Sequence, residues 1–137
     1  MKYILDTNVC INFLKGNIPS LAKKFSSVSK ENRIIPSVVR AELFYGAYKS
    51  TFPEKNIKVV KEFLNLHPEL DFDSKSSEIY GQIRTDLEKK GTPIGPYDLQ
   101  IAAITIANNC ILVTHNTKEF SRVNNLQIED WEISANS

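Results

Sequence analysis

Four acidic residues stand beside apolar stretches of the sequence, where a carboxylate is costly unless its charge is compensated. Asp6 follows a short run of strand-forming residues, and Glu42 lies within an apolar helical pattern. Asp98 comes two residues after a proline that suits a first helical turn, and Glu119 comes three residues after an asparagine. Carboxylates without paired histidines or a cysteine set form a hard-oxygen site, which suits Mg²⁺ or Mn²⁺ and is poor for zinc. Such a site leaves room for substrate phosphates, so the first chemistry to consider is metal-dependent and acts on phosphate groups.

Each of these acids also has a structural explanation. Asp6 can end a strand at a turn, Glu42 can be a solvated helix residue, and Asp98 is a favourable charge in a first helical turn. Glu119 can be the far half of a capping box that begins at Asn116. These separate explanations do not account for the fact that all four acids adjoin apolar runs, and at least three lie at strand ends or helix starts. Together the four acids predict a pocket.

The elements that must position these acids are short strands that alternate with helices. We expect strands at residues 3–5, 33–35, 70–72, 111–113 and 126–128. We expect helices from a cap at Thr7 or Asn8 to Gly16, over 18–28, 38–48 and 54–66, from a cap at Asp73 or Ser74 to residues 89–91, over 96–107, and near Glu119. This alternation predicts an α/β sandwich with a mostly parallel sheet, whose ligands bind beyond the carboxyl ends of the strands.

The composition sets the size and charge of the protein. With 137 residues, of which 42% are hydrophobic, we expect residues 1–137 to form a single domain. Seventeen basic and sixteen acidic residues give a net charge of +1, so any nucleic acid must bind to a local basic patch. Without a long apolar stretch or a signal segment, we expect a soluble, cytoplasmic protein with no membrane contact. Cys10 and Cys110 are expected to be buried, reduced thiols.

Four sequence motifs carry a resemblance to a known family. They are LDTN at residues 5–8, AELFYGA at 41–47, DLQIAA at 98–103 and THNTKEF at 114–120. In this order and at these separations, in a chain of this size that continues to IEDW at 128–131, the sequence resembles PIN-domain ribonucleases. Specifically, it is similar along essentially its whole length to the VapC-type toxins of bacterial toxin–antitoxin pairs.

The resemblance implies a PIN-like three-layer sandwich and a magnesium-dependent endoribonuclease. The catalytic acids would be Asp6, Glu42, Asp98 and Glu119, and the metal, Mg²⁺ or Mn²⁺, would be held by Asp6 and Asp98. Glu119 stands where many relatives have aspartate, which leaves open whether it reaches the ion directly, through water, or only caps a helix. Thr7 and Asn116 would orient the acids. His115 stands at a variable position, and we expect it to be an exposed loop residue.

The resemblance also implies three partners: an RNA substrate, a cognate VapB-type antitoxin and a second copy of the chain in a homodimer. An arginine or lysine of the antitoxin, inserted among the carboxylates, would compete with Mg²⁺. The dimer is further suggested by the helices around 25–28 and 57–64, which carry more apolar surface than so small a sheet needs. RNA phosphates could be contacted by the basic residues closest to the motifs, which are Lys15, Arg40, Lys49, Arg84 and Lys118.

Three other classes of protein are possible. A catalytically silent PIN-like module that binds RNA or a partner is the main alternative, and the presence of three family acids argues against it. A phosphotransferase with an aspartyl nucleophile would need a second acid next to the first, and Asp6 is followed by Thr7 and Asn8. A nucleotide-binding Rossmann module would need a glycine-rich loop after the first strand, and none is present.

Overall fold

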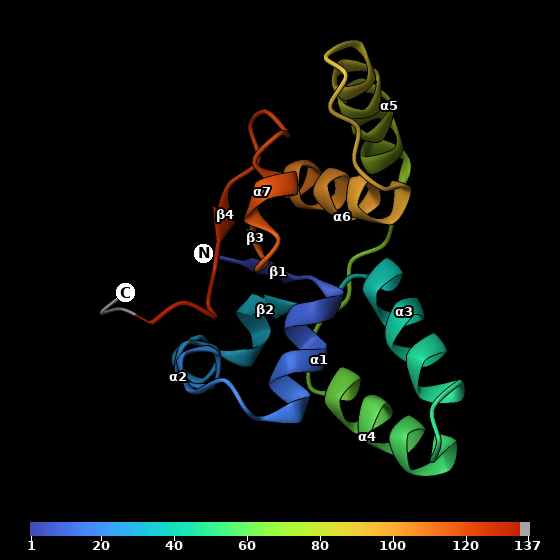
Figure 1. Ribbon diagram of the computed structural model, residues 1–137, viewed down its shortest axis with the longest axis vertical. Coiled ribbons are helices and arrows are strands. Elements are labelled where there is room, and N and C mark those ends of the chain that lie inside the picture. The colour runs from blue at the N-terminus through green and yellow to red at the C-terminus, as the bar shows by residue number, and fades with distance from the viewer. Residues whose placement is uncertain (135–137) are drawn as a thin grey trace.

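The computed structural model describes residues 1–134, in which a small sheet lies between groups of helices (Figure 1). The strands are β1 (Tyr3–Leu5), β2 (Arg33–Ile34), β3 (Ile111–Val113) and β4 (Ile128–Glu129). The helices are α1 (Thr7–Lys15), α2 (Pro19–Ser27), α3 (Ser37–Tyr48), α4 (Pro53–Asn65), α5 (Ser74–Lys89), α6 (Pro96–Ala107) and α7 (Thr117–Phe120), with a 3₁₀ turn η1 (Lys30–Asn32). All strand pairs are parallel, in the order β2-β1-β3-β4. The predicted α/β fold is therefore confirmed.

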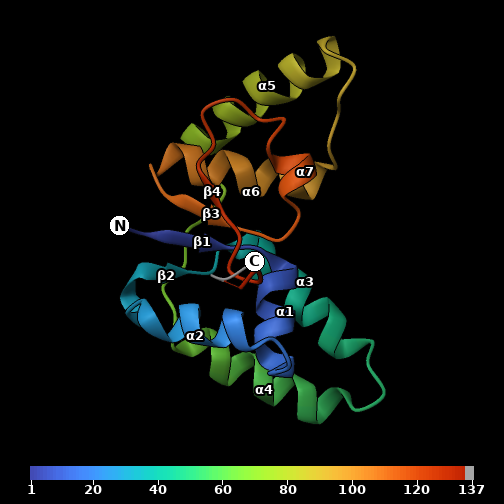
Figure 2. The ribbon, with the colours of Figure 1, turned by 60° about the vertical axis from the view of Figure 1, so that its left-hand side comes forward.

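The sheet forms the middle of three layers. Helices α1, α2 and α4 lie on one side of it, and α5 and α6 lie on the other (Figures 1 and 2). Both faces of the central strands are therefore covered, and Ile4, Leu5 and Leu112 are fully buried. Helix α6 is buried along most of its length, as its nearly continuous apolar sequence predicts. Cys10 and Cys110 are buried and unpaired, as expected of reduced thiols.

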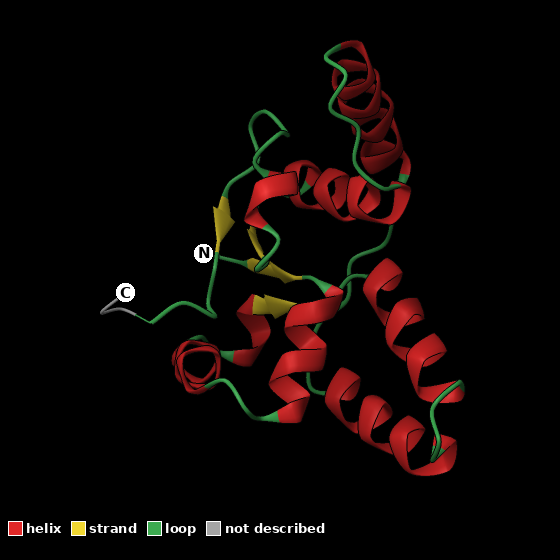
Figure 3. Cartoon of the chain, viewed as in Figure 1, coloured by secondary structure: helices red, strands yellow, loops and turns green. Residues whose placement is uncertain are grey.

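Three strands lead almost directly into helices at one edge of the sheet. β1 is followed by α1, β2 by α3 and β3 by α7 (Figure 3). Because parallel strands have their carboxyl ends at the same edge, the first turns of these three helices meet there. Asp6 lies between β1 and α1, and Asn116 lies between β3 and α7. The fold thus brings two of the predicted motifs to one edge.

Three of the expected strands differ from the structure, of which the one expected at 33–35 differs least and ends at Ile34. The expected strand at 70–72 is wrong: this segment pairs with no strand, and the Leu70 carbonyl instead accepts a hydrogen bond of 3.0 Å from the amide of Ser37, the first residue of α3. The last strand begins at Ile128 and not at Leu126. Asn125 adopts a positive φ of 65° just before it, and this turn delays the pairing with β3.

The apolar helices that suggested spare surface for a dimer are used within the chain. Phe25, Val60, Phe63 and Leu64 are all buried in the core. Phe25 stacks on Phe13 with ring centroids 3.6 Å apart. Most of the apolar surface of these helices is therefore used within the chain, although Val59 of α4 stays 40% exposed. The homodimer stays a prediction from the family resemblance.

Candidate active site

Asp6 is a buried carboxylate, only 6% exposed, at the carboxyl end of β1. It is itself the N-cap of α1, because its Oδ1 accepts a hydrogen bond of 2.9 Å from the Val9 amide. The cap expected at Thr7 or Asn8 is thus supplied one position earlier. Burial raises the pKa of Asp6 to about 6, against the lowering effects of hydrogen bonds from the Thr114 side chain and the Val9 amide. Asp98 and Glu132 add to the rise through like-charge repulsion.

Asp98 lies in the first turn of α6, where Pro96 starts the helix as predicted. It is half-buried, and this burial is the largest cause of its raised pKa. The negative charges of Glu119 and Glu42 raise the pKa further. The charges of Glu119 and Glu42 therefore act on Asp98, and the charge of Asp98 acts on Asp6. These four carboxylates, which we call the acidic edge, are electrostatically linked through Asp98.

The side chains around Glu119 do not form the capping box that would explain it structurally. Asn116 is the N-cap of α7, and its side chain makes no capping hydrogen bond. Its Nδ2 donates instead to Glu119 Oε2, at 3.3 Å, and its backbone amide donates to the Thr114 hydroxyl, at 3.0 Å. This contact lets Asn116 orient the Glu119 carboxylate.

The hydroxyl that contacts Asp6 belongs to Thr114, which the sequence analysis did not single out. Thr114 is fully buried at the carboxyl end of β3, next to β1 in the sheet. Thr7 opens α1, and within the described residues its hydroxyl makes no hydrogen bond. The only sequence signal for Thr114 is a hydroxyl residue directly after a buried strand.

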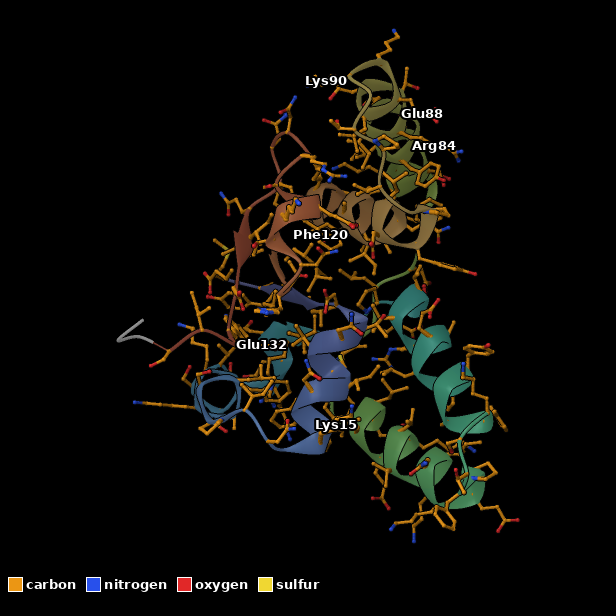
Figure 4. All side chains as sticks on the ribbon, in the orientation of Figure 1. Lys15, Arg84, Glu88, Lys90, Phe120 and Glu132 are labelled. Carbon is orange, nitrogen blue, oxygen red and sulfur yellow. The ribbon has the colours of Figure 1, made fainter. Side chains whose placement is uncertain are left out.

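A second residue that the sequence analysis missed is Glu132, an acid that reaches the site from the C-terminal segment. Its carboxylate accepts hydrogen bonds from the Asn12 amide group at 3.2 and 3.3 Å, and its carbonyl accepts one from the Ser20 hydroxyl at 2.8 Å. Figure 4 labels Glu132 between this segment and α1. Its charge raises the pKa of Asp6. Nothing in the sequence near Glu132 indicates this contact, because it joins positions 120 residues apart.

His115 lies in the loop after β3 and is exposed, as expected. Its Nδ1 lies 2.9 Å from Asp130 Oδ2, and this hydrogen bond raises the pKa of the imidazole. The pair joins the β3–α7 loop to the C-terminal segment. The contact accounts for His115 without a part in the reaction.

Two of the basic residues expected to meet RNA have other contacts. The Arg40 side chain is only 15% exposed, and its guanidinium donates to the carbonyls of Ile35 at 2.7 Å, His67 at 2.9 Å and Pro68 at 3.1 Å. This replaces the expected phosphate contact with a structural role. Arg84 is exposed on α5, where it bonds the Tyr80 hydroxyl and pairs with Glu88 (Figure 4). Lys15, Lys49 and Lys118 are exposed.

A groove of about 510 Å³ lies between α1, α3 and α4. Its lining is mainly apolar and includes Ile11, Leu14 and Val59. Glu42 also lines the groove, and the same side chain raises the pKa of Asp98. The groove therefore meets the acidic edge at Glu42.

The acidic edge suits a hard cation that keeps most of its water ligands. Among residues 1–134, no three acidic, histidine or cysteine side chains are close enough to enclose a metal ion. The donors are nevertheless carboxylate oxygens, and the pKa values of Asp6 and Asp98 are raised first by burial and further by neighbouring negative charge. A divalent cation would remove that repulsion, and Mg²⁺ is commonly held by only one or two carboxylates. The residues present therefore fit Mg²⁺ bound in an open site.

Comparison with known proteins defines the class first. The sequence profile of the PIN domain matches residues 3–126. The chain is 40% identical over 131 residues to the tRNA(fMet)-specific endonuclease VapC of Shigella flexneri, covering 96% of this chain and 98% of that protein. It is 43% identical over 133 residues to ribonuclease VapC2 of Rickettsia felis, with 96% and 99% covered. The chain therefore belongs to the PIN-domain family, as a VapC-type endoribonuclease toxin.

Solved structures agree with this assignment. VapBC of Salmonella typhimurium bound to DNA contains a chain that is 40% identical, with a TM-score of 0.90 and coverage of 96% of this chain and 98% of that one. VapBC2 of Rickettsia felis, bound to a fragment of its promoter, gives 42% identity and a TM-score of 0.89, with 96% and 99% covered.

No helix among the described residues is long and apolar enough to cross a bilayer.

Proposed function

We propose that this chain hydrolyses RNA phosphodiesters with Mg²⁺ held by Asp6 and Asp98, and with Glu42 and Glu119 beside them. The observation that carries the proposal is the gathering of these four carboxylates at one edge of the sheet, where burial first, and the charges of neighbouring acids second, raise the pKa of both aspartates. Retaining like charges at one place costs stability, and a cation that is needed for function explains why they are retained. Mn²⁺ has the same donor preference and would substitute.

The residues of the chain would prepare this site in distinct ways. When bound, Mg²⁺ supplies an activated water and neutralises charge on the phosphate. The Val9 amide and the Thr114 hydroxyl fix Asp6, so that its carboxylate does not have to be ordered when the ion arrives. Asn116 does the same for Glu119. Thr7, at the first position of α1, remains a proposed support.

The proposed substrate is a transfer RNA. The Shigella relative, 40% identical along nearly the whole chain, is named for cleavage of tRNA(fMet), and this is the substrate to test first. Residues 1–137 would act as one nuclease domain on one hydrophobic core, in the cytoplasm where transfer RNA is found.

A cognate VapB-type antitoxin would restrain the enzyme. The solved relatives are VapBC complexes, and the groove between α1, α3 and α4 offers an apolar seat that ends at Glu42. An apolar partner segment in this groove could place a basic residue among the carboxylates. A homodimer would be the restrained species.

Cleavage of initiator tRNA by the purified chain tests the function. We expect cleavage with Mg²⁺, none with EDTA, and none for Asp98→Asn. Asp86→Asn is the matched control, because Asp86 is a partly exposed acid of α5 whose carboxylate pairs with Lys90. Cleavage that persists in EDTA would contradict the metal. Binding of RNA without cleavage by the wild type, at any Mg²⁺ concentration, would favour the silent binding module.

The mode of restraint has its own test. The chain is co-purified with the product of the neighbouring gene, and every basic residue in the partner's C-terminal tail is replaced by glutamine. We expect inhibition to be lost, and inhibition by the unmodified partner to weaken as Mg²⁺ is raised. Full inhibition by the glutamine variant would contradict charge insertion.

A further inference from the structure

Most of the aromatic side chains in this protein are packed against one another or in the core. The rings that stand out in solvent are Tyr45, Tyr48, Phe52 and Tyr97, each at least 60% exposed. Two of them lie beside the acidic edge: Tyr97 directly precedes Asp98, and Tyr45 comes three residues after Glu42 on α3.

Tyr45 is part of a stripe on α3. Glu42, Tyr45 and Lys49 are spaced by three and four residues, so they share one face of the helix. Lys49 Nζ lies 5.0 Å from the centroid of the Tyr45 ring. The stripe thus carries an acid of the catalytic edge, an exposed ring and a cation, over a helical rise of about 10 Å.

Tyr97 lies in the first turn of α6, between Pro96 and Asp98 in the chain. Pro96 suits this turn because its ring presets the helical backbone. Helices α3 and α6 pack against each other, and Glu42 of α3 is close enough for its charge to act on Asp98 of α6. Within residues 1–134, neither Tyr45 nor Tyr97 forms a hydroxyl hydrogen bond or a ring–ring contact. The packing of the core therefore does not depend on these two rings.

From these positions we propose that Tyr45 and Tyr97 stack against unpaired bases of the RNA on either side of the bond that is cut, with Lys49 contacting the adjoining phosphate. Aromatic rings bind unstacked bases regardless of sequence, and a neighbouring cation adds attraction for the backbone. The substrate class is therefore RNA with a single-stranded or loop segment at the cut. A second copy of the chain would better fit aliphatic residues than tyrosines flanked by acids and a lysine.

This inference rests on the proposed function, and the two can be tested separately. Tyr45→Ala, Tyr97→Ala and the corresponding Phe variants are assayed for cleavage of initiator tRNA. The same changes are placed on Asp98→Asn, and binding is followed with a twelve-nucleotide single-stranded RNA that carries 2-aminopurine, whose fluorescence falls on stacking. Tyr48→Ala is the matched control, since Tyr48 is 65% exposed on the same helix but lies six residues after Glu42, off the helix face that carries this acid.

We expect each Ala variant to lose roughly 10-fold in kcat/KM and in RNA affinity, mainly through KM, while the Phe variants and Tyr48→Ala stay within about 2-fold of their parents. Fluorescence quenching should be weaker in the Ala variants alone. Ala variants that match Tyr48→Ala in both assays would overturn the inference, even if the wild type cleaves RNA. A fall from dimer to monomer mass in light scattering would also overturn it and assign the rings to an interface between copies. Weaker binding by the Ala variants without any cleavage would support stacking and contradict the nuclease proposal.

Discussion

Asp6 and Arg40 are both largely withdrawn from solvent near the carboxyl ends of adjacent strands, yet their surroundings are opposite. Arg40 donates to three backbone carbonyls at 2.7 to 3.1 Å and ties α3 to the connection between α4 and α5. Asp6 has two donors of its own and faces further negative charge from Asp98 and Glu132. A fully partnered buried charge supports the fold, whereas a buried charge with like charges around it is retained for binding.

The largest effect is expected when the acids proposed to bind the metal are neutralised. Asp98→Asn and Asp6→Asn should each lower single-turnover cleavage at least 1,000-fold, which corresponds to about 4 kcal/mol of transition-state stabilisation. The variants should keep the circular dichroism spectrum of the wild type. Residual activity within about 10-fold of wild type in both would mean that these acids do not hold the metal.

The structural side of the comparison is tested by replacing Arg40. Arg40→Met should lower the free energy of unfolding by about 2–4 kcal/mol, because three carbonyls lose a charged donor. Urea denaturation measures this change. Arg84→Met should leave the midpoint almost unchanged, since Arg84 is exposed and bonds only within α5. An equal effect of the two changes would show that the Arg40 contacts carry no special weight.

Removing the Asp6 charge should stabilise the protein in the absence of metal. The folded pKa of Asp6, about 6, lies above the ordinary value of 3.8. The stability this group contributes is present below pH 3.8 and is lost as pH rises through about 6. Asp6→Asn should therefore raise the free energy of unfolding by about 1–3 kcal/mol at pH 8 and by little at pH 4. Thermal unfolding at both pH values measures this, and a loss of stability at pH 8 would make Asp6 a structural acid.

The smallest expected effect is on metal affinity. Mg²⁺ must displace the proton of Asp6, so lowering the pH from 7.5 to 5.5 should weaken binding by at least about 4-fold. Calorimetric titration measures the affinity. Asp6→Asn should bind Mg²⁺ more weakly, with a smaller dependence on pH. An affinity of the wild type that is the same at both pH values would contradict linked carboxylates.

The sequence predicted most of the strands and the helix starts, because these depend on residues that are close together in the chain. Asp98 follows Pro96 in the first turn of α6, and the structure has that turn. Contacts that join distant positions were missed. Thr114 approaches Asp6 only because β1 and β3 pair, and Glu132 meets Asn12 only because the C-terminal segment returns to α1. Arg40 was expected to contact phosphate because its real partners could not be seen in the sequence. They are mostly carbonyls of residues 64–68, beyond the range of any helical pattern.

The order of the strands also governs when the enzyme can become active during its synthesis. β1 leaves the ribosome well before its neighbour β3, which begins at Ile111, more than a hundred residues later. Such distant pairing is slow to form, because the intervening chain must first be made and brought back. Until then Asp6 lacks the strand that carries Thr114, and the segment holding Glu119 does not exist. The nascent chain therefore cannot assemble the acidic edge until β3 and α7 have been made.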